Sequence, residues 1–310
     1  MHIMKKYSIY SILVLTLFCI PNYLYSAEDD SSNENNITSG PPNGSLVIVG
    51  GAMQDSNIVL KFIELAGGKD SPIVVVPAAM GLDSVNQERV IRFLTRFGAT
   101  NVQVVHTKNP EEANTIEFVE PIQKAKAVWF TGGRQWRIVD AYANTLAEKE
   151  FQKVLERGGV IGGSSAGATI QGSYLARGDT KTNRIMMGDH QKGFGYLKNC
   201  AIDQHLLVRN RQFDLIEILN AHPELLGIGL DENTAIVVQG DEFEVIGKSF
   251  VAIYDTQLWV EESRTDDKPV LPNGGKFFLL RAGDKYNTRT REVIHWQGTN
   301  RGISRDKDVK

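Results

Sequence analysis

Apolar runs rich in valine and isoleucine alternate with helical patterns along most of the first 165 residues, and this alternation limits the available folds more than any other feature. The run "IVVVP" at 73–77 lacks the alternation of apolar and polar residues that a strand with one exposed face shows, as expected of a strand covered on both faces. The segment "WRIVDAYANTLAEKEFQKVLERGG" at 136–159 has a helical pattern instead. Strands that alternate with helices form a mostly parallel sheet with helices on either side, so we predict an α/β fold.

The pattern changes after about Leu226, where apolar and polar residues alternate as in strands with one exposed face. Three such segments are "TAIVVQGDEFEVIG", "SFVAIYD" and "KFFLLRAGDKYN", and Gly240–Asp241 is a typical turn between two strands. We predict that these segments add antiparallel strands to the same domain and do not form a second domain.

The first 27 residues have the organisation of a secretory signal peptide. Lys5 and Lys6 precede an apolar stretch, Tyr7–Ile20, and the small residues Ser26 and Ala27 follow. A membrane anchor is one alternative, but a proline and an asparagine end the stretch before the roughly twenty residues that cross a bilayer. Lipidation of the cysteine inside the stretch is another, which the bulky phenylalanine before it disfavours. The sequence therefore predicts export to the periplasm or the medium and no stable membrane span.

The predicted boundaries are a signal peptide at 1–27, a polar linker at 28–44, one α/β domain at 45–300 and a tail at 301–310. Removal of the signal peptide would leave Cys200 as the single cysteine, so no intrachain disulfide could form. The net charge of −3 and the lack of basic clusters argue against nucleic acid as a partner. The oligomeric state stays open, and a homodimer is compatible with the sequence.

The segment "GSSAG" at 163–167 fits the G-x-S-x-G pattern with Ser165 at its centre. Small residues on both sides permit a sharp strand-to-helix turn, which places the serine hydroxyl where backbone N–H groups can stabilise an oxyanion. The candidate donors are the N–H of Ala166 and that of Gly132 or Gly133 at a neighbouring strand end. A phosphate-binding turn and a turn that only permits close packing are the alternatives.

A serine nucleophile needs a base, usually histidine, and an acid that orients the base. We expect His205 to be the base, because polar residues gather at its junction between an apolar strand and a helix, and His190 in a loop is the runner-up. We expect Glu232 to be the acid, because it lies between two apolar runs just after closely spaced glycines. An exposed turn of Asp231, Glu232 and Asn233 is the alternative. No cluster of His, Cys and carboxylates has zinc-like spacing, so neither a metal nor another cofactor is predicted.

Four segments, "FTGGRQ", "GGSSAGA", "DQHLLVRNR" and "GIGLDENTA", together resemble the motifs of the cyanophycinases, serine peptidases of family S51 that are related to the aspartyl dipeptidase peptidase E. The resemblance extends from about Leu46 to Asp255. It implies a three-layer, Rossmann-like sandwich similar to the class I glutamine amidotransferase domain, with Ser165, His205 and Glu232 as nucleophile, base and orienting acid. It also implies a pocket for the aspartyl unit of the substrate formed by Gln135, Asp203, Gln204, Arg209 and Arg211.

The implied reaction is the exo-acting hydrolysis of cyanophycin, a polyaspartate that carries arginine on its β-carboxyls, to β-aspartyl-arginine dipeptides. Arg209 or Arg211 can hold a free carboxylate by forked hydrogen bonds, and only one of them is expected to contact the substrate, because residues two apart do not share one side of a helix. Cyanophycinases generally have another arginine at the position of Asp214. An anion there should weaken the binding of an acidic substrate.

Three alternatives to a cyanophycinase follow from that difference and from the bare motif. One is a peptidase for other aspartyl or isoaspartyl peptides, and the second is an esterase or amidase on the same scaffold. The third is an exported binding protein that keeps the pocket without activity. The presence of all three triad candidates favours the catalytic alternatives.

Overall fold

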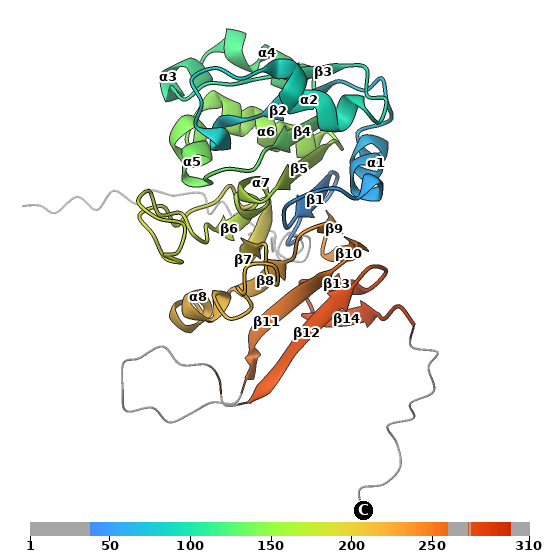
Figure 1. The fold of residues 1–310 in the computed structure, drawn as a ribbon, viewed down its shortest axis with the longest axis vertical. Helices are drawn as coiled ribbons and strands as arrows, with labels where there is room; N and C mark the ends of the chain where they lie inside the picture. Colours follow the sequence, from blue (N-terminus) through green and yellow to red (C-terminus); the bar gives the residue numbers. More distant parts are fainter. Residues whose placement is uncertain (1–37, 260–271, 273, 299–310) are drawn as a thin grey trace, which may run out of the picture. The chain divides into compact units, whose positions relative to one another are not determined.

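The structure is a computed structural model that describes residues 38–259, 272 and 274–298. The predicted signal peptide, most of the predicted linker and the tail lie outside the described residues. The described part forms two sheets with helices around them (Figure 1). The predicted α/β class, with a mostly parallel central sheet and antiparallel strands added to it, is confirmed.

Parallel strands form the centre of the larger sheet, as the alternating apolar runs predict. Their spatial order is β1-β5-β4-β2-β3, and every pair in this series is parallel. The strands are β1 (Ser45–Val49), β2 (Ile73–Val76), β3 (Val102–Val104), β4 (Ala127–Phe130) and β5 (Val160–Ser164). Parallel strands share the direction of their carboxyl ends, so the segments that follow β1, β4 and β5 emerge at one edge.

Helices cover both faces of the larger sheet and make three layers. Val47 and Val49 of β1 pack into a core with α1 (Ser56–Leu65) and α2 (Gln87–Thr95), where Phe62 meets Trp129 edge to face at 4.9 Å. The alternate residues Leu46 and Ile48 enter the core on the other face, where Phe130 meets Phe151 at 5.0 Å. That second core is covered by η3 (Ala78–Met80), α3 (Pro110–Ala113), α4 (Ile116–Lys124), α5 (Trp136–Tyr142) and α6 (Leu146–Glu156).

Side-chain caps explain where several of these helices begin. Asn86 accepts the backbone N–H of Arg89 at 2.9 Å, and Thr145 does the same for Glu148 at 3.4 Å. Such caps satisfy donors that have no partner within the helix, and each stabilises a helix by about 1 kcal/mol. The caps therefore fix the chain positions at which the covering helices start.

The C-terminal strands divide between two sheets, which the sequence did not predict. From β1 the larger sheet continues antiparallel through β9 (Thr234–Gln239), β10 (Glu242–Gly247), β13 (Lys285–Asn287) and β14 (Glu292–His295). The second sheet has the order β12-β11-β8-β7-β6, with β6 (Gly172–Tyr174), β7 (Leu197–Gln204), β8 (Leu226–Leu230), β11 (Phe250–Trp259) and β12 (Gly275–Arg281). Helix α8 (Leu215–Ala221) packs on this sheet. The division arises because the chain crosses between the sheets at 231–233, at 248–249 and again at 282–284.

Residues 38–44 lie against the body of the protein, although their composition assigns them to the linker. The N–H of Gly40 donates to the Gly240 carbonyl at 2.8 Å, and the N–H of Ser39 donates to Asp241 Oδ1 at 2.6 Å. The turn at Gly240–Asp241, predicted from the sequence, thus also holds the start of the described chain. In the described residues no helix has the length and apolar character needed to cross a membrane.

Backbone hydrogen bonds bring three strand ends together. The N–H of Ser165, after β5, donates to the Val49 carbonyl at 3.0 Å. The N–H groups of His205, after β7, and of Asn233, after β8, donate to the carbonyls of Gly50 at 2.9 Å and Gly51 at 3.0 Å. The segment that follows β1 therefore connects the larger sheet to the second one at the candidate site.

Candidate active site

Ser165 occupies the sharp turn between β5 and α7 (Ala166–Thr169). Its φ of 58° lies in the left-handed region, which costs a non-glycine residue about 1–3 kcal/mol. The turn is as crowded as the small residues of the motif predict. A Cβ at Gly163 would lie 2.5 Å from the carbonyl carbon of Gly167, and a Cβ at Gly167 would lie 2.7 Å from that of Phe130.

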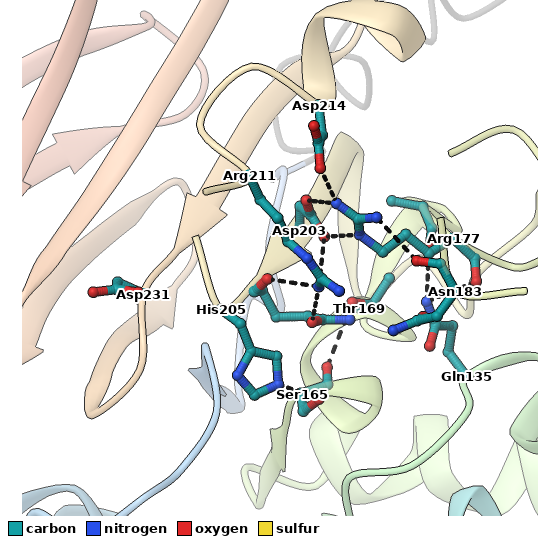
Figure 2. Close-up of polar contacts among 12 residues, drawn as sticks. Gln135, Ser165, Thr169, Arg177, Asn183, Asp203, His205, Arg211, Asp214 and Asp231 are labelled. Carbon is teal, nitrogen blue, oxygen red and sulfur yellow. Dashed lines mark hydrogen bonds and ion pairs between the residues drawn. The ribbon is translucent and has the colours of Figure 1, made fainter. Parts of the chain in front are cut away.

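The three predicted triad residues are joined by hydrogen bonds. Ser165 Oγ lies 2.8 Å from Nε2 of His205 (Figure 2). Nδ1 of His205 lies 2.6 Å from Oε1 of Glu232. Each ring nitrogen of the histidine therefore has one partner. A carboxylate on Nδ1 favours the tautomer that carries its proton there, which leaves Nε2 free to accept the proton of the serine.

The surroundings of His205 keep its imidazole neutral. Burial lowers the pKa of His205 below the ordinary histidine value, and the positive charges of Arg209 and Arg211 lower it further. The hydrogen bond and the charge of Glu232 raise the pKa but do not outweigh these effects. At neutral pH the ring is therefore unprotonated, which is the state that a general base requires.

Gly50 and Gly51, directly after β1, contact the histidine of the site. Gly51 has a φ of 134°, and a Cβ there would lie 2.6 Å from Nδ1 and 2.9 Å from Nε2 of His205. The imidazole therefore packs directly against the backbone of Gly51. This segment is a functional element that sequence reasoning missed, and its signal was the glycine pair at the end of the first strand.

The predicted oxyanion donors lie next to Ser165. A Cβ at Gly132 would lie 3.4 Å from the Cβ of Ser165, so the end of β4 borders the serine. Gly133 has a φ of 147°, and a Cβ there would lie 2.9 Å from the N atom of Met80. The N–H groups of Ala166 and Gly133 have no hydrogen-bond acceptor among the described residues. Gly133 is exposed whereas Ala166 is fully buried, so the structure leaves the N–H of Gly133 open to a substrate oxygen.

Gln135 holds a loop and does not face open space. Its side chain is fully buried, and Nε2 donates to the carbonyls of Ala176 at 2.6 Å and Arg177 at 3.0 Å. Oε1 is buried without a hydrogen-bond partner in the described part of the chain. The geometry thus shows a structural role, the anchoring of the loop that begins at Arg177, and the role in lining the pocket stays a prediction.

Asp203 forms a buried ion pair. Its side chain is fully buried, and both carboxylate oxygens accept hydrogen bonds from Arg177, at 2.8 Å from Nε and 2.9 Å from Nη2. The predicted contact with the substrate is not what the geometry shows, because no surface of Asp203 is open to a ligand. Sequence reasoning missed Arg177, and the signal for it was one charged residue in the otherwise small and apolar segment "GSYLARG".

Arg177 joins three segments of the chain. Besides the fork to Asp203, it forms an ion pair with Asp214 through Nη2 and donates from Nη1 to the carbonyl of Asn183 at 3.0 Å (Figure 2). The guanidinium is only 3% exposed, whereas the side chain of Asp214 is 36% exposed. The anion at position 214 therefore does not stand alone beside the pocket, because a buried cation from another segment faces it.

The two arginines after His205 have different surroundings. Arg211 is buried and donates from Nη1 to both the main-chain oxygen of Gln204 at 3.0 Å and its Oε1 at 2.8 Å. Arg209 is exposed, and its side chain has no hydrogen-bond or ion-pair partner within residues 38–259 and 274–298, although its charge lowers the pKa of His205. Arg209 is therefore the cation available to a ligand carboxylate.

His190, the runner-up for the base, is bound elsewhere. Its Nε2 lies 2.9 Å from Oδ1 of Asp140, and its Nδ1 lies 3.3 Å from Oδ1 of Asp189. Burial lowers the pKa of His190, but the two carboxylates outweigh it and the net direction is upward. Both ring nitrogens are thus occupied by acids, and neither contacts Ser165.

A mixed α/β fold that brings together a serine, a histidine and a glutamate at its strand ends has the arrangement found in acyl-transfer hydrolases. Residues 46–246 match the profile of peptidase family S51, so the chain belongs to this family.

Known relatives agree with this membership. The chain is 32% identical over 261 residues to a cyanophycinase from Geminocystis herdmanii, a match that covers 81% of this chain and 96% of the relative. A cyanophycinase from a Nostoc species is 28% identical over 265 residues, with coverage of 81% and 87%. The crystal structure of a peptidase from an acI-B1 Actinobacterium has the same fold, with a TM-score of 0.56 at 24% identity over 80% of this chain and 98% of that one.

Proposed function

We propose that this protein is an exported serine peptidase that hydrolyses cyanophycin by acyl transfer. Ser165 is the nucleophile, His205 the general base and Glu232 the residue that orients the base. The observation that carries the proposal is the continuous hydrogen-bonded chain from Ser165 Oγ through both ring nitrogens of His205 to Glu232. The crowded turn that holds Ser165 in a strained conformation supports the same assignment.

In the first half of the reaction, Ser165 Oγ bonds to the carbonyl carbon of the substrate while His205 Nε2 accepts its proton. The charge of Glu232 stabilises the imidazolium, and the N–H groups of Ala166 and Gly133 bind the oxyanion. When the C–N bond breaks, the leaving amine takes the proton from His205. The aspartyl group remains on Ser165 as an ester.

In the second half, water replaces the amine. His205 accepts a proton from the water as its oxygen bonds to the ester carbonyl, and the same N–H groups hold the second oxyanion. Ser165 leaves and regains its proton from His205, which releases the acid. Neither half requires a metal ion or a cofactor.

The substrate assignment rests on the cyanophycinase relatives and on one cation. Arg209 is exposed and close enough to His205 to affect its pKa, so it is placed to bind a carboxylate of the substrate. Arg211 and Asp203 are bound to protein groups and act by shaping the pocket. Of the two arginines after His205, Arg209 is therefore the one that contacts the substrate.

Product analysis tests this function. The mature protein is incubated with purified cyanophycin, and soluble products are identified by mass spectrometry beside a Ser165→Ala control. Release of β-aspartyl-arginine by the wild type alone is expected. A folded wild type that releases none would exclude cyanophycin as the substrate.

A peptidase for other aspartyl or isoaspartyl peptides is the second candidate, and Asp214 is the observation that favours it. The ion pair with Arg177 offsets this anion without adding a free cation to the pocket. A library of isoaspartyl dipeptides, assayed beside cyanophycin, separates the two candidates. Faster turnover of a dipeptide without arginine would favour the second.

Export is proposed from the charged, apolar and small-residue order of the first 27 residues. In a bacterial host the full-length chain is expected to reach the periplasm or medium and to begin near Glu28 after processing. N-terminal sequencing of the exported protein measures this. A cytoplasmic protein that retains its first residues would contradict it.

A further inference from the structure

Asp231 makes an unusual set of contacts beside the triad. Its side chain is only 4% exposed, and Oδ1 accepts the backbone N–H groups of Leu207 at 2.9 Å and Val208 at 3.1 Å. Oδ2 accepts the hydroxyl of Ser249 at 2.6 Å. This carboxylate is therefore satisfied by three donors and needs no cation.

The two N–H groups belong to the turn that carries the histidine. His205 itself has a φ of 57°, a strained value for a residue with a side chain. The N–H of His205 donates to Gly50, and that of Leu206 donates to the Leu230 carbonyl at 3.1 Å. The next two N–H groups have Asp231 as their acceptor. Without it, both would lose their partner, and the strained turn would lose half of its backbone anchors.

The same residue fixes the segment that carries the acid. Asp231 directly precedes Glu232, and its own N–H donates to the carbonyl of Phe250 at 3.1 Å. Ser249, which holds the other carboxylate oxygen, donates its N–H to Oγ1 of Thr234 at 2.8 Å. Contacts from 249–250 thus hold both ends of the short segment that contains Glu232.

We propose that Asp231 is a positioning residue that fixes the base and its orienting acid relative to each other. Its carboxylate connects the turn after His205 to the segment that contains Glu232, and it connects both of these to Ser249. Asp231 does not contact Ser165 or the imidazole, and Figure 2 shows it apart from that pair. This inference rests on the proposed triad and adds to it a residue that holds two of its members.

The test compares Asp231→Ala with Asp284→Ala. Asp284 is also buried and accepts two backbone N–H groups, from Arg281 at 2.8 Å and Gln297 at 2.6 Å, but it lies in the turn between β12 and β13. A displacement of about 1 Å at a reacting group costs about 10²-fold in rate. We expect Asp231→Ala to lower the rate at which a fluorophosphonate labels Ser165 by about that factor, and Asp284→Ala to leave it unchanged.

Two milder variants keep the test informative if Asp231→Ala fails to fold. Asp231→Asn retains an oxygen for the N–H groups of Leu207 and Val208, so it should recover most of the labelling rate. Ser249→Ala removes one contact and should slow labelling several-fold. All variants are assayed well below their measured midpoints of thermal unfolding.

The pH profile separates positioning from general stability. Since Glu232 raises the pKa of His205, a displaced Glu232 should move the midpoint of the labelling profile of Asp231→Ala to lower pH. Asp231→Ala with wild-type rate and midpoint would overturn the inference, as would an equal loss in Asp284→Ala. Failure of the wild type to label would instead count against the proposed triad.

Discussion

The imidazole of His205 packs against Gly51 so closely that a side chain at position 51 has no room. A Cβ there would lie 2.6 Å from Nδ1 and 2.9 Å from Nε2, the two nitrogens that bind Glu232 and Ser165. The contact joins the first strand of the larger sheet to the end of β7 in the second. The position of His205 therefore depends on the absence of a side chain at Gly51, a residue far from it in the sequence.

Gly51→Ala should remove most activity without unfolding the protein. The new methyl must displace the imidazole from one of its two hydrogen bonds, and we expect a loss of about 10²-fold in kcat. Gly68→Ala is the matched control, because Gly68 has a φ of 107° but a Cβ there meets nothing within 4 Å. Both variants carry the cost of a positive φ, and only Gly51→Ala should lose activity. Equal kinetics in the two would contradict this account of the contact.

Activity should stay constant from neutral pH down to below the ordinary pKa of histidine and then fall. The pKa of His205 is lowered in the folded protein, so the ring protonates only at more acidic pH. Unfolding restores the ordinary, higher pKa of His205. The folded protein therefore also loses stability as the pH falls from the ordinary histidine pKa to the lowered one. The profile of kcat/KM against pH measures this. A midpoint above the ordinary histidine pKa would contradict the lowered pKa of His205.

Glu232→Gln should shift this profile in a defined direction. The variant removes a charge that raises the pKa of His205, so the midpoint should move to lower pH. The maximal rate should nevertheless fall, by up to about 10⁴-fold, because the variant has no carboxylate to orient the histidine and stabilise the imidazolium. A midpoint that moves upward would show that Glu232 does not act on His205 in this way.

The strain at Ser165 predicts an unusual order of stabilities. With a φ of 58°, Ser165→Gly should be more stable than Ser165→Ala by about 1 kcal/mol in the free energy of unfolding, although neither has activity. Urea denaturation of the two inactive variants measures the difference. An alanine variant that is the more stable of the pair would show that the turn is not strained.

Arg177 should matter more for stability than an exposed cation does. Arg177→Met leaves the buried Asp203 with only Arg211, whose Nη1 lies 3.9 Å from Oδ1, and the loss of one member of a buried pair typically costs about 3–5 kcal/mol. Lys124→Met, which breaks an exposed pair with Glu120, should change the unfolding midpoint little. Asp214→Arg places a second cation against Arg177 and should also destabilise, whereas Asp214→Asn should be mild. Equal midpoints for Arg177→Met and Lys124→Met would contradict the structural role.

Features carried by a short stretch of chain could be predicted from the sequence. The turn at Ser165 follows from the small residues beside it, and the parallel sheet follows from apolar runs such as Ile73–Val76. In each case the sterics or the burial pattern of a few consecutive residues contains the information.

Features that depend on distant segments could not be predicted. Arg177 is bound by Asp203, Asp214 and Asn183, and no local pattern pairs these residues. The family resemblance implies that Asp203 lines the pocket, whereas its ion pair with Arg177 explains why its side chain is buried. The division of the C-terminal strands is likewise set by three crossings between sheets, and the alternating pattern does not specify which strands pair after each crossing.

The most direct test of the account is to label the mature protein with a fluorophosphonate and to locate the probe by mass spectrometry of proteolytic peptides. One probe per chain is expected on Ser165, and the labelling rate should fall by at least about 10³-fold in His205→Ala. A probe on the adjacent Ser164, or no labelling of a folded wild type, would contradict a catalytic chain from Ser165 through His205 to Glu232.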